Sequence, residues 1–244
     1  MAYRPPKAAI GGDEVAFGAP HRHFRVTDST NARARELAEA GVPGGTVVTA
    51  EEQTAGRGRQ GRTWTAPTGK ALLYSAVLRP LDERHMLLPL AVPLAVCEAA
   101  EELRPGIECA IKWPNDVWLD ERKLAGVLIE AKPQDGWAVI GVGLNLSIAP
   151  DEFPDDLRWP AISLFGALVA ATAALNRHLD RWVAAPRNEI LAAWRSRDAL
   201  RGRDVAWDGG AGVAEGIDDS GDLLVVVGGG DRVVLGAGEV HLRL

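Results

Sequence analysis

Five short apolar runs constrain the fold of this chain most strongly. They cover residues 46–52, 70–78, 107–113, 123–131 and 136–146. Runs of this length, rich in apolar and β-branched residues, predict β-strands. Helical patterns lie between and after them, at 32–40, 84–103, 164–185 and 187–200. The sequence therefore predicts an α/β (α+β) domain, in which a mixed sheet has helices packed on one side.

The pattern of residue types changes near residue 200. From there, short β runs alternate with Gly and Asp turns, a pattern that favours a small barrel of about five strands. Residues 1–19 are rich in Pro and Gly and are expected to form a loosely ordered segment. We therefore divide the chain into this segment, a domain at 20–198 and a small β domain at 200–244.

Charge and composition limit the classes of partner. The net charge is -6 and the pI about 5.4, whereas a general binder of polyanions is basic. The N-terminus lacks the apolar region of a signal peptide, and no apolar run approaches the roughly 18 residues of a membrane span. The two cysteines, Cys97 and Cys109, are expected to be reduced core residues. We expect a cytoplasmic protein.

The run GRGRQGRTW at 56–64 concentrates positive charge in this acidic chain. Glycines let the backbone approach a phosphate or close as a loop, and arginines donate in pairs to phosphate oxygens. Trp64 suits an apolar substrate or a base. The glycines and arginines concerned are Gly56, Gly58, Gly61, Arg57, Arg59 and Arg62. A solvated arginine loop fits the same composition, so the residues alone leave both interpretations open.

A second polar group lies within strand-like sequence at 112–130 and comprises Lys112, Asn115, Asp116 and Lys123. Pro114 indicates a turn, and a hairpin over 111–130 would carry the two lysines on neighbouring strands. Cations beside an arginine loop predict a bound anion, although solvated lysines at a turn remain the alternative.

The remaining polar candidates are an asparagine and the histidines. Asn145 is set in an apolar run, where its amide needs partners, and bonding to the backbone is the plain alternative to a site role. The histidines, His21, His23, His85, His178 and His241, show no metal-ligand spacing. They are expected to be surface or core residues.

Five motifs in order resemble the biotin protein ligases, also called biotin–[acetyl-CoA-carboxylase] ligases. They are DSTN at 28–31, EEQTAGRGRQGRTW at 51–64, KWPNDV at 112–117, RKLAGVLIE at 122–130 and GVGLNL at 141–146. The segments at 214–226 and 235–243 resemble that family's C-terminal SH3-like domain. The resemblance covers 28–244. Lipoate ligases share the fold but lack the paired GRGRxGRxW and KWPND motifs.

The resemblance implies a two-step reaction. Biotin's carboxylate attacks the α-phosphorus of ATP, giving biotinyl-5′-AMP and pyrophosphate, and a lysine of a biotin carboxyl carrier domain then displaces AMP. ATP and biotin are the implied substrates, with Mg²⁺ as cofactor. Some members carry a DNA-binding domain before DSTN, but here DSTN begins at residue 28. We therefore expect an enzyme-only form. It should be a monomer or weak homodimer that binds neither nucleic acid nor membrane.

The resemblance also implies residue roles. Lys123 and Arg59 would be catalytic. The biotin site would comprise Ser29, Thr30, Asn31, Gln53, Gly56, Arg57, Gly58, Arg59, Trp64, Lys123 and Gly126. The ATP and adenylate site would comprise Arg57, Arg59, Arg62, Lys112, Asn115, Asp116 and Asn145. The metal ligands stay unknown, with Asp116 as a candidate. The alternatives are a nucleic-acid-binding module, disfavoured by the acidic pI, and a biotin-binding protein without catalysis.

Overall fold

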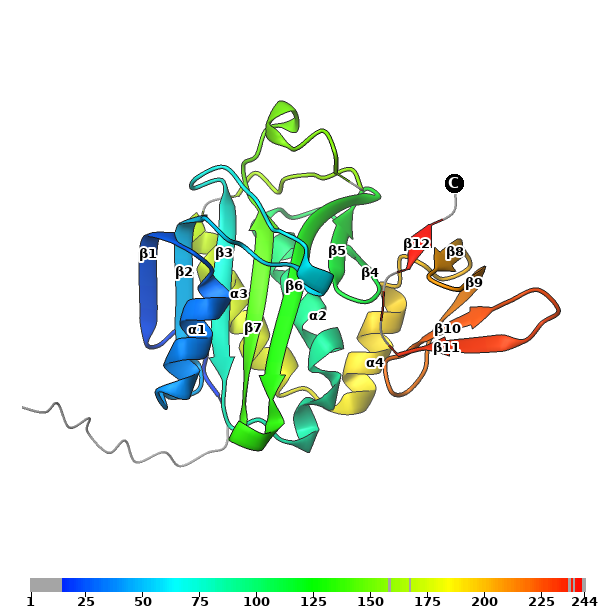
Figure 1. Ribbon diagram of the computed structural model, residues 1–244, viewed down its shortest axis with the longest axis horizontal. Helices are drawn as coiled ribbons and strands as arrows, with labels where there is room; N and C mark the ends of the chain where they lie inside the picture. Colours follow the sequence, from blue (N-terminus) through cyan, green and yellow to red (C-terminus); the bar gives the residue numbers. More distant parts are fainter. Residues whose placement is uncertain (1–14, 158, 167, 237, 239, 243–244) are drawn as a thin grey trace, which may run out of the picture.

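The computed structural model describes residues 15–157, 159–166, 168–236, 238 and 240–242. Most of the predicted N-terminal segment, residues 1–14, lies outside this range. The described chain contains a seven-stranded sheet, with strand order β1-β2-β3-β7-β6-β5-β4, and a separate five-stranded sheet beside it (Figure 1). The division into domains at 20–198 and 200–244 stays a prediction.

The large sheet is mixed, as predicted. Its strands are β1 (His21–Thr27), β2 (Val47–Gln53), β3 (Ala71–Leu78), β4 (Ala110–Lys112), β5 (Asp116–Leu119), β6 (Arg122–Lys132) and β7 (Trp137–Asn145). Strand β1 runs parallel to β2, and the other neighbouring strands are antiparallel. The apolar runs did not predict β1, because this edge strand is mostly exposed and carries two arginines and two histidines.

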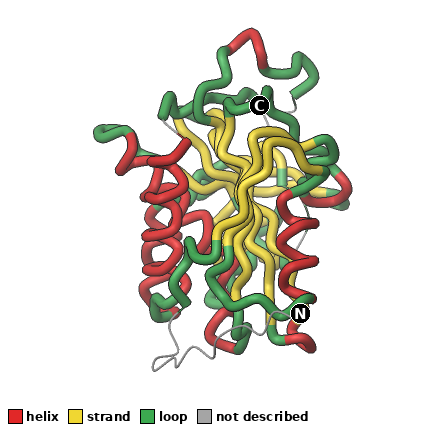
Figure 2. The backbone as a smooth tube through the Cα atoms, turned by 90° about the vertical axis from the view of Figure 1, so that its left-hand side faces the viewer, coloured by secondary structure: helices red, strands yellow, loops and turns green. Residues whose placement is uncertain are grey.

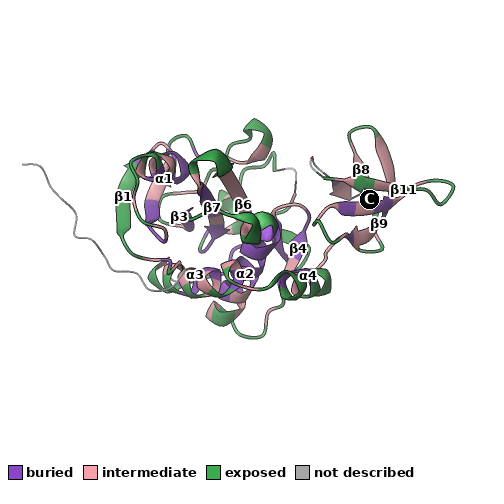
Figure 3. Cartoon of the chain, turned by 90° about the horizontal axis from the view of Figure 1, so that it is seen from below, coloured by how far each residue is buried: buried purple, intermediate pink, exposed green. Residues whose placement is uncertain are grey.

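Helices cover both faces of the large sheet (Figure 2), so the prediction that all helices pack on one side is wrong for one of them. Helices α2 (Leu88–Leu103), α3 (Leu168–Val183) and α4 (Arg187–Ser196) lie below the sheet in Figure 3, and α1 (Thr30–Glu39) lies above it. Tyr74 of β3 belongs to the core between the sheet and helices α2 and α3, whereas Val77 shares a separate core cluster with Ala34 of α1. Side chains alternate between the faces of a strand, and all of β3 is buried, which requires a layer on each side.

Helix α2 starts later than the helical pattern at 84–103 predicts, and its prolines explain the delay. A 3₁₀ turn, Glu83–Leu87, replaces the first part of the predicted helix. The α-helix begins at Leu88 with Pro89 in its first turn, and Pro93 is buried inside it. The first turn tolerates proline because its N–H groups have no partner within the helix.

The interior matches the prediction for the two cysteines. Cys97 of α2 and Cys109 before β4 are both buried and free. Burial raises the pKa of the Cys97 thiol, which keeps it protonated and unreactive. No helix in the described part of the chain is long and apolar enough to cross a bilayer.

The second sheet has the five strands that the tail predicts, all antiparallel. They are β8 (Asp204–Trp207), β9 (Gly210–Ile217), β10 (Leu223–Val226), β11 (Arg232–Leu235) and β12 (His241–Leu242). The order β11-β10-β9-β8-β12 leaves β11 and β12 as edges within the described residues. This is an open sheet, and closure into an SH3-like barrel stays a prediction.

Polar contacts join the second sheet to the first part of the chain. Trp113 Nε1, beside β4, donates to the carbonyl oxygen of Gly221 at 3.1 Å. Arg195 of α4 donates to Asp219 Oδ1 at 2.8 Å. These contacts hold the β9–β10 turn against the end of the large sheet, so residues of both sheets can line one pocket.

Candidate functional site

The run GRGRQGRTW forms an ordered hairpin that lies over the large sheet. Its two arms are joined by backbone contacts between Gly56 and Trp64, Arg57 and Thr63, and Gly58 and Arg62. The tip is the 3₁₀ turn Arg59–Gly61, in which Gln60 and Gly61 have φ of 56° and 74°. A left-handed turn of this kind explains the glycine at 61.

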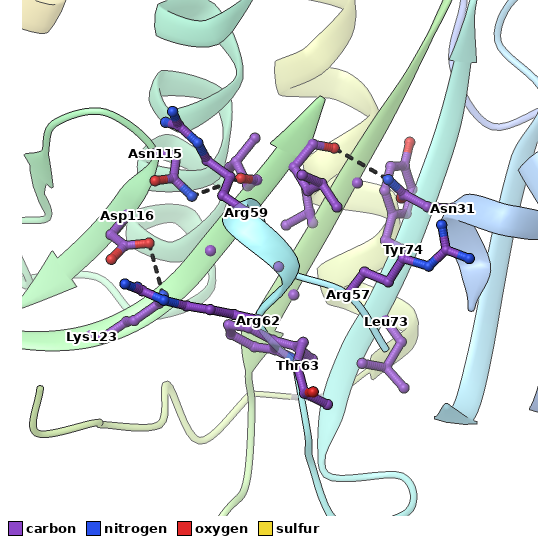
Figure 4. A pocket seen from close by; sticks show the side chains of 18 of the residues that line it. Asn31, Arg57, Arg59, Arg62, Thr63, Leu73, Tyr74, Asn115, Asp116 and Lys123 are labelled. Atoms are coloured by element: carbon purple, nitrogen blue, oxygen red, sulfur yellow. Dashed lines mark hydrogen bonds and ion pairs between the residues drawn. The ribbon is translucent and has the colours of Figure 1, made fainter. Parts of the chain in front are cut away.

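Beneath the hairpin is a pocket formed by both sheets and the start of α1 (Figure 4). It brings together most of the residues implied by the resemblance: Ser29, Thr30, Asn31, Gln53, Arg57, Gly58, Arg59, Arg62, Trp64, Lys112, Asn115, Asp116, Lys123 and Gly126. Gly56 and Asn145 are absent from its lining. Residues from motifs that are separate in the sequence therefore line one pocket.

One end of the pocket consists of neutral hydrogen-bonding groups. The Thr30 backbone N–H and hydroxyl both lie against Gln53 Oε1, at 2.7 and 3.0 Å. Ser29 occupies the N-cap position of α1, but its side chain makes no cap hydrogen bond. Uncharged groups that both donate and accept suit a ligand head that does the same.

Gly141 of β7 makes room for Asn31 at this end. A Cβ atom on Gly141 would overlap the side-chain amide of Asn31. We expect Gly141→Ala to lower the free energy of unfolding by about 1–3 kcal/mol, the usual effect of overpacking, as measured by urea denaturation. Gly228→Ala is the control, since a Cβ there meets nothing within 4 Å. Equal stability of the two variants would contradict this account of Gly141.

The middle of the pocket is filled by the Trp64 ring. A Cβ on Gly143 would overlap this ring, and one on Gly126 would lie 3.0 Å from it. These two glycines are paired across β6 and β7, so together they form a flat seat for the indole. Gly126 was expected to allow close approach of biotin; the group that lies against it here is Trp64.

The other end of the pocket is charged. Lys123 Nζ on β6 lies 2.8 Å from Asp116 Oδ1 on β5 and 5.6 Å from the centre of the Trp64 ring. Lys112 lies on β4, opposite Asp116. The two lysines are therefore separated by β5, and the prediction that they occupy neighbouring strands is wrong. The turn at 113–115 already reverses the chain, so the segment forms three strands rather than one hairpin.

The three arginines of the hairpin point in different directions. Figure 4 shows Arg57 directed toward Asn31, Arg59 toward Asn115 and Arg62 toward Lys123. Burial lowers the pKa of the Arg59 guanidinium, and the charge of Asp116 acts in the opposite direction. An arginine remains charged at neutral pH despite such a shift. Arg59 is thus a half-buried cation at the pocket wall, whereas Arg57 and Arg62 are exposed.

Asn145 follows the plain alternative. Its amide nitrogen donates to the carbonyl oxygens of Ile162 at 3.1 Å and Lys123 at 3.4 Å. Gly56 is buried at the base of the hairpin, where a Cβ would overlap the Trp64 carbonyl oxygen. Neither residue lines the pocket, and their contact with ligand stays a prediction.

Trp159 and His241 are among the lining residues that the sequence interpretation did not assign to the site. The ring of Trp159 lies 5.5 Å from that of Trp118 and 6.5 Å from that of His241, and Lys112 Nζ is 5.5 Å from its centre. His241 belongs to β12 of the second sheet. The prediction that His241 is a plain surface or core residue is wrong, because it lines the pocket. No spacing in the sequence shows that β12 lies beside Trp159.

The electrostatics of the pocket oppose those of the whole chain. Among the residues that the structure describes, five cationic side chains line it, from Arg57, Arg59, Arg62, Lys112 and Lys123, and one carboxylate, from Asp116. A small anionic group is therefore favoured at the charged end. Within the described residues, no group of three or more His, Cys, Asp or Glu side chains is arranged to hold a metal ion.

Comparisons with known proteins agree with this geometry. A family model described as "Biotin/lipoate A/B protein ligase family" matches residues 23–146. The "Biotin--[acetyl-CoA-carboxylase] ligase" of Mycobacterium tuberculosis is 39% identical, over 98% of this chain and 97% of its own length. The ligase of the same name from Paracoccus denitrificans is 37% identical, over 88% of this chain and 97% of its own length.

A solved structure extends the agreement to the fold. The biotin protein ligase from Aquifex aeolicus in complex with biotin and ATP superposes with a TM-score of 0.76 and 29% identity. The alignment covers 93% of this chain and 99% of that one. The chain therefore belongs to the biotin/lipoate A/B protein ligase family, as one of its biotin protein ligases.

Proposed function

We propose that this enzyme uses ATP to attach biotin to a lysine of a biotin carboxyl carrier domain, through biotinyl-5′-AMP. One observation carries the proposal: a single pocket joins a neutral hydrogen-bonding end to a cationic end beneath a glycine-rich hairpin. A cyclic urea suits the first end and a phosphate the second. The relatives' names and the Aquifex aeolicus complex support the same substrates.

The neutral end would hold the ureido head of biotin. Ser29, Thr30 and Gln53 line it, and a urea needs acceptors for its N–H groups and donors for its carbonyl oxygen. Leu73, Val142 and the Trp64 ring supply apolar surface beside this end. In this orientation, the valeryl chain would carry biotin's carboxylate toward Lys123.

Lys123 would act at the first chemical step. A carboxylate oxygen of biotin forms a bond to the α-phosphorus, and the bond from that phosphorus to pyrophosphate breaks. Negative charge grows on the phosphoryl oxygens as the bond forms, and a fixed ammonium stabilises it. Asp116, 2.8 Å from Lys123 Nζ, would hold the lysine in place. No enzyme nucleophile is needed.

The hairpin would protect the product of that step. A mixed anhydride hydrolyses in water and acylates nearby amines, so it must stay covered until the carrier arrives. Arg59 is the central cation of the hairpin, and its guanidinium would contact the adenylate phosphate. In the second step, the ε-amine of the carrier lysine attacks the acyl carbon of biotin. An amide bond forms and AMP leaves.

Mg²⁺ fits the donor set at the charged end. Magnesium is usually held by one or two carboxylates together with substrate phosphates and water, and Asp116 is the carboxylate that lines this pocket. The bound ion would neutralise phosphate charge. Asp116 would then share its carboxylate between Mg²⁺ and Lys123.

The test of the function uses the full chain with biotin, MgATP and a biotin carrier domain. We expect one carrier lysine to gain the mass of biotin less one water, and pyrophosphate to be released with biotin present. Binding without pyrophosphate release would favour a biotin-binding protein without catalysis. Transfer of lipoate in place of biotin would favour the other branch of the family.

Nucleic acid is not an expected partner. With a net charge of -6, the chain lacks the overall positive charge on which DNA affinity depends. We expect no sequence-specific shift of duplex DNA in a gel at physiological salt, with or without biotin. Tight, sequence-dependent binding under those conditions would contradict this prediction.

A further inference from the structure

Ser75 is a buried hydroxyl that touches the pocket only through other residues. It lies on β3 with no exposed surface and is absent from the pocket lining. Its Oγ is 2.8 Å from Thr30 Oγ1 and 2.6 Å from Asn31 Oδ1. Thr30 and Asn31 both line the neutral end, so Ser75 supports that end from behind.

Glu130 fixes which way the Asn31 amide faces. Asn31 Nδ2 donates to Glu130 Oε2 at 2.8 Å and to the Leu128 carbonyl oxygen at 3.4 Å. Arg35 Nη1 lies 3.5 Å from the other carboxylate oxygen. An ionised carboxylate only accepts hydrogen bonds. The amide nitrogen must therefore face Glu130, and the amide oxygen must face Ser75.

Counting protons then determines the polarity of Thr30. Ser75 has one hydroxyl proton, and Asn31 Oδ1 can only accept it. Thr30 must use its own proton toward Ser75 Oγ or toward Gln53 Oε1, 3.0 Å away. In either case the proton is used in a hydrogen bond within the protein. The lone pairs of Thr30 Oγ1 remain for a ligand, so this hydroxyl is a hydrogen-bond acceptor in the pocket.

The geometry points to Ser75 and Glu130 as positioning residues that hold Thr30 as an acceptor for a ring N–H of a cyclic urea. This inference rests on the proposed function, in which biotin's ureido head lies at this end. It also supplies a basis for specificity. A dithiolane ring such as that of lipoate has no N–H and gains nothing from an oriented acceptor, whereas a urea gains one hydrogen bond.

Ser75→Ala tests the inference in the full-length enzyme. Without Ser75, the Thr30 proton loses one of its two acceptors inside the protein, Gln53 Oε1 being the other, so it is freer to turn toward the ligand N–H. We expect the Kd for biotin, measured by calorimetry, to rise roughly tenfold, the usual scale of one hydrogen bond. Dethiobiotin, which keeps the cyclic urea, should weaken by the same factor. The KM for ATP and kcat at saturating biotin should stay within about twofold of wild type.

Two further variants separate positioning from general damage. Glu130→Gln removes the ion that orients Asn31 while keeping the side-chain shape, so it should reproduce the selective loss of urea affinity even if Ser75→Ala folds poorly. Thr46→Val is the matched control, because Thr46 is buried and its hydroxyl donates to the Pro43 carbonyl oxygen away from the pocket. It should leave the Kd for biotin unchanged.

The outcomes distinguish this inference from the proposed function. Unchanged biotin affinity in both Ser75→Ala and Glu130→Gln would overturn the positioning role alone. The same would follow if the KM values for biotin and ATP rose together, since that is the result of a distorted sheet. A wild-type enzyme that binds no biotin in the same titration would overturn the proposed function, and this inference with it.

Discussion

Replacing Lys123 with alanine should lower the rate of biotinyl-adenylate formation by on the order of 100-fold or more, the scale for loss of one preorganised charge. Lys123 lies at the charged end of the pocket, 2.8 Å from Asp116, where it would face the attacked phosphorus. The measurement is biotin-dependent exchange of pyrophosphate into ATP, which reports the first step without a carrier protein.

A lysine on the same strand provides the control for Lys123. Lys132 of β6 pairs with Glu39 on the surface at 2.8 Å, far along the strand from the pocket. Exposed ion pairs contribute about 0–1 kcal/mol to stability, so Lys132→Ala should exchange pyrophosphate at the wild-type rate. Near-normal exchange by Lys123→Ala, with its fold intact by circular dichroism, would remove Lys123 from the reaction.

Arg59→Gly should convert the enzyme into a source of free biotinyl-AMP. Lys123 and the residues of β4 and β5 remain, so the adenylate still forms. It should be held less tightly by about 2–3 kcal/mol, the contribution of one charge-assisted contact. The escaping anhydride would then acylate lysines of a bystander such as serum albumin, which streptavidin blotting detects beside the wild-type reaction.

Two controls define what the Arg59 result means. Arg59→Ala removes the guanidinium without adding the backbone freedom of glycine, so it should leak to a similar extent if charge is the cause. Arg232→Ala removes an exposed arginine of the second sheet, paired with Glu215, and should label no more bystander than wild type. Equal labelling by Arg59→Gly and wild type would return the arginine run to the status of a solvated loop.

The large sheet was predictable because its strands carry their own signal. The predicted runs at 46–52, 70–78 and 136–146 correspond to β2, β3 and β7 within a residue or two. β1 carried no such signal, since it is an exposed edge stabilised by pairing with β2 rather than by burial. The side on which α1 packs was also invisible, because alternation along a strand does not say what covers each face.

The pocket was predictable to the extent that its residues lie in local motifs. The motif residues of α1, the hairpin and β4–β6 meet as expected because each motif is short and the sheet aligns them. Ser75, Trp159 and His241 were missed for different reasons. Ser75 has the appearance of an ordinary strand residue, and its role depends on Thr30 and Asn31 lying above it. The other two reach the site through loops and strands whose course no local pattern records.

The position of His241 has a consequence for how the protein comes into being on the ribosome. The residues of the neutral end, the hairpin and the charged end are all translated before residue 150, whereas His241, which also lines the pocket, belongs to β12. A nascent chain that has exposed only the large sheet therefore lacks this lining residue. A chain whose synthesis stopped before β12 would carry the lining residues of the large sheet without His241 beside Trp159.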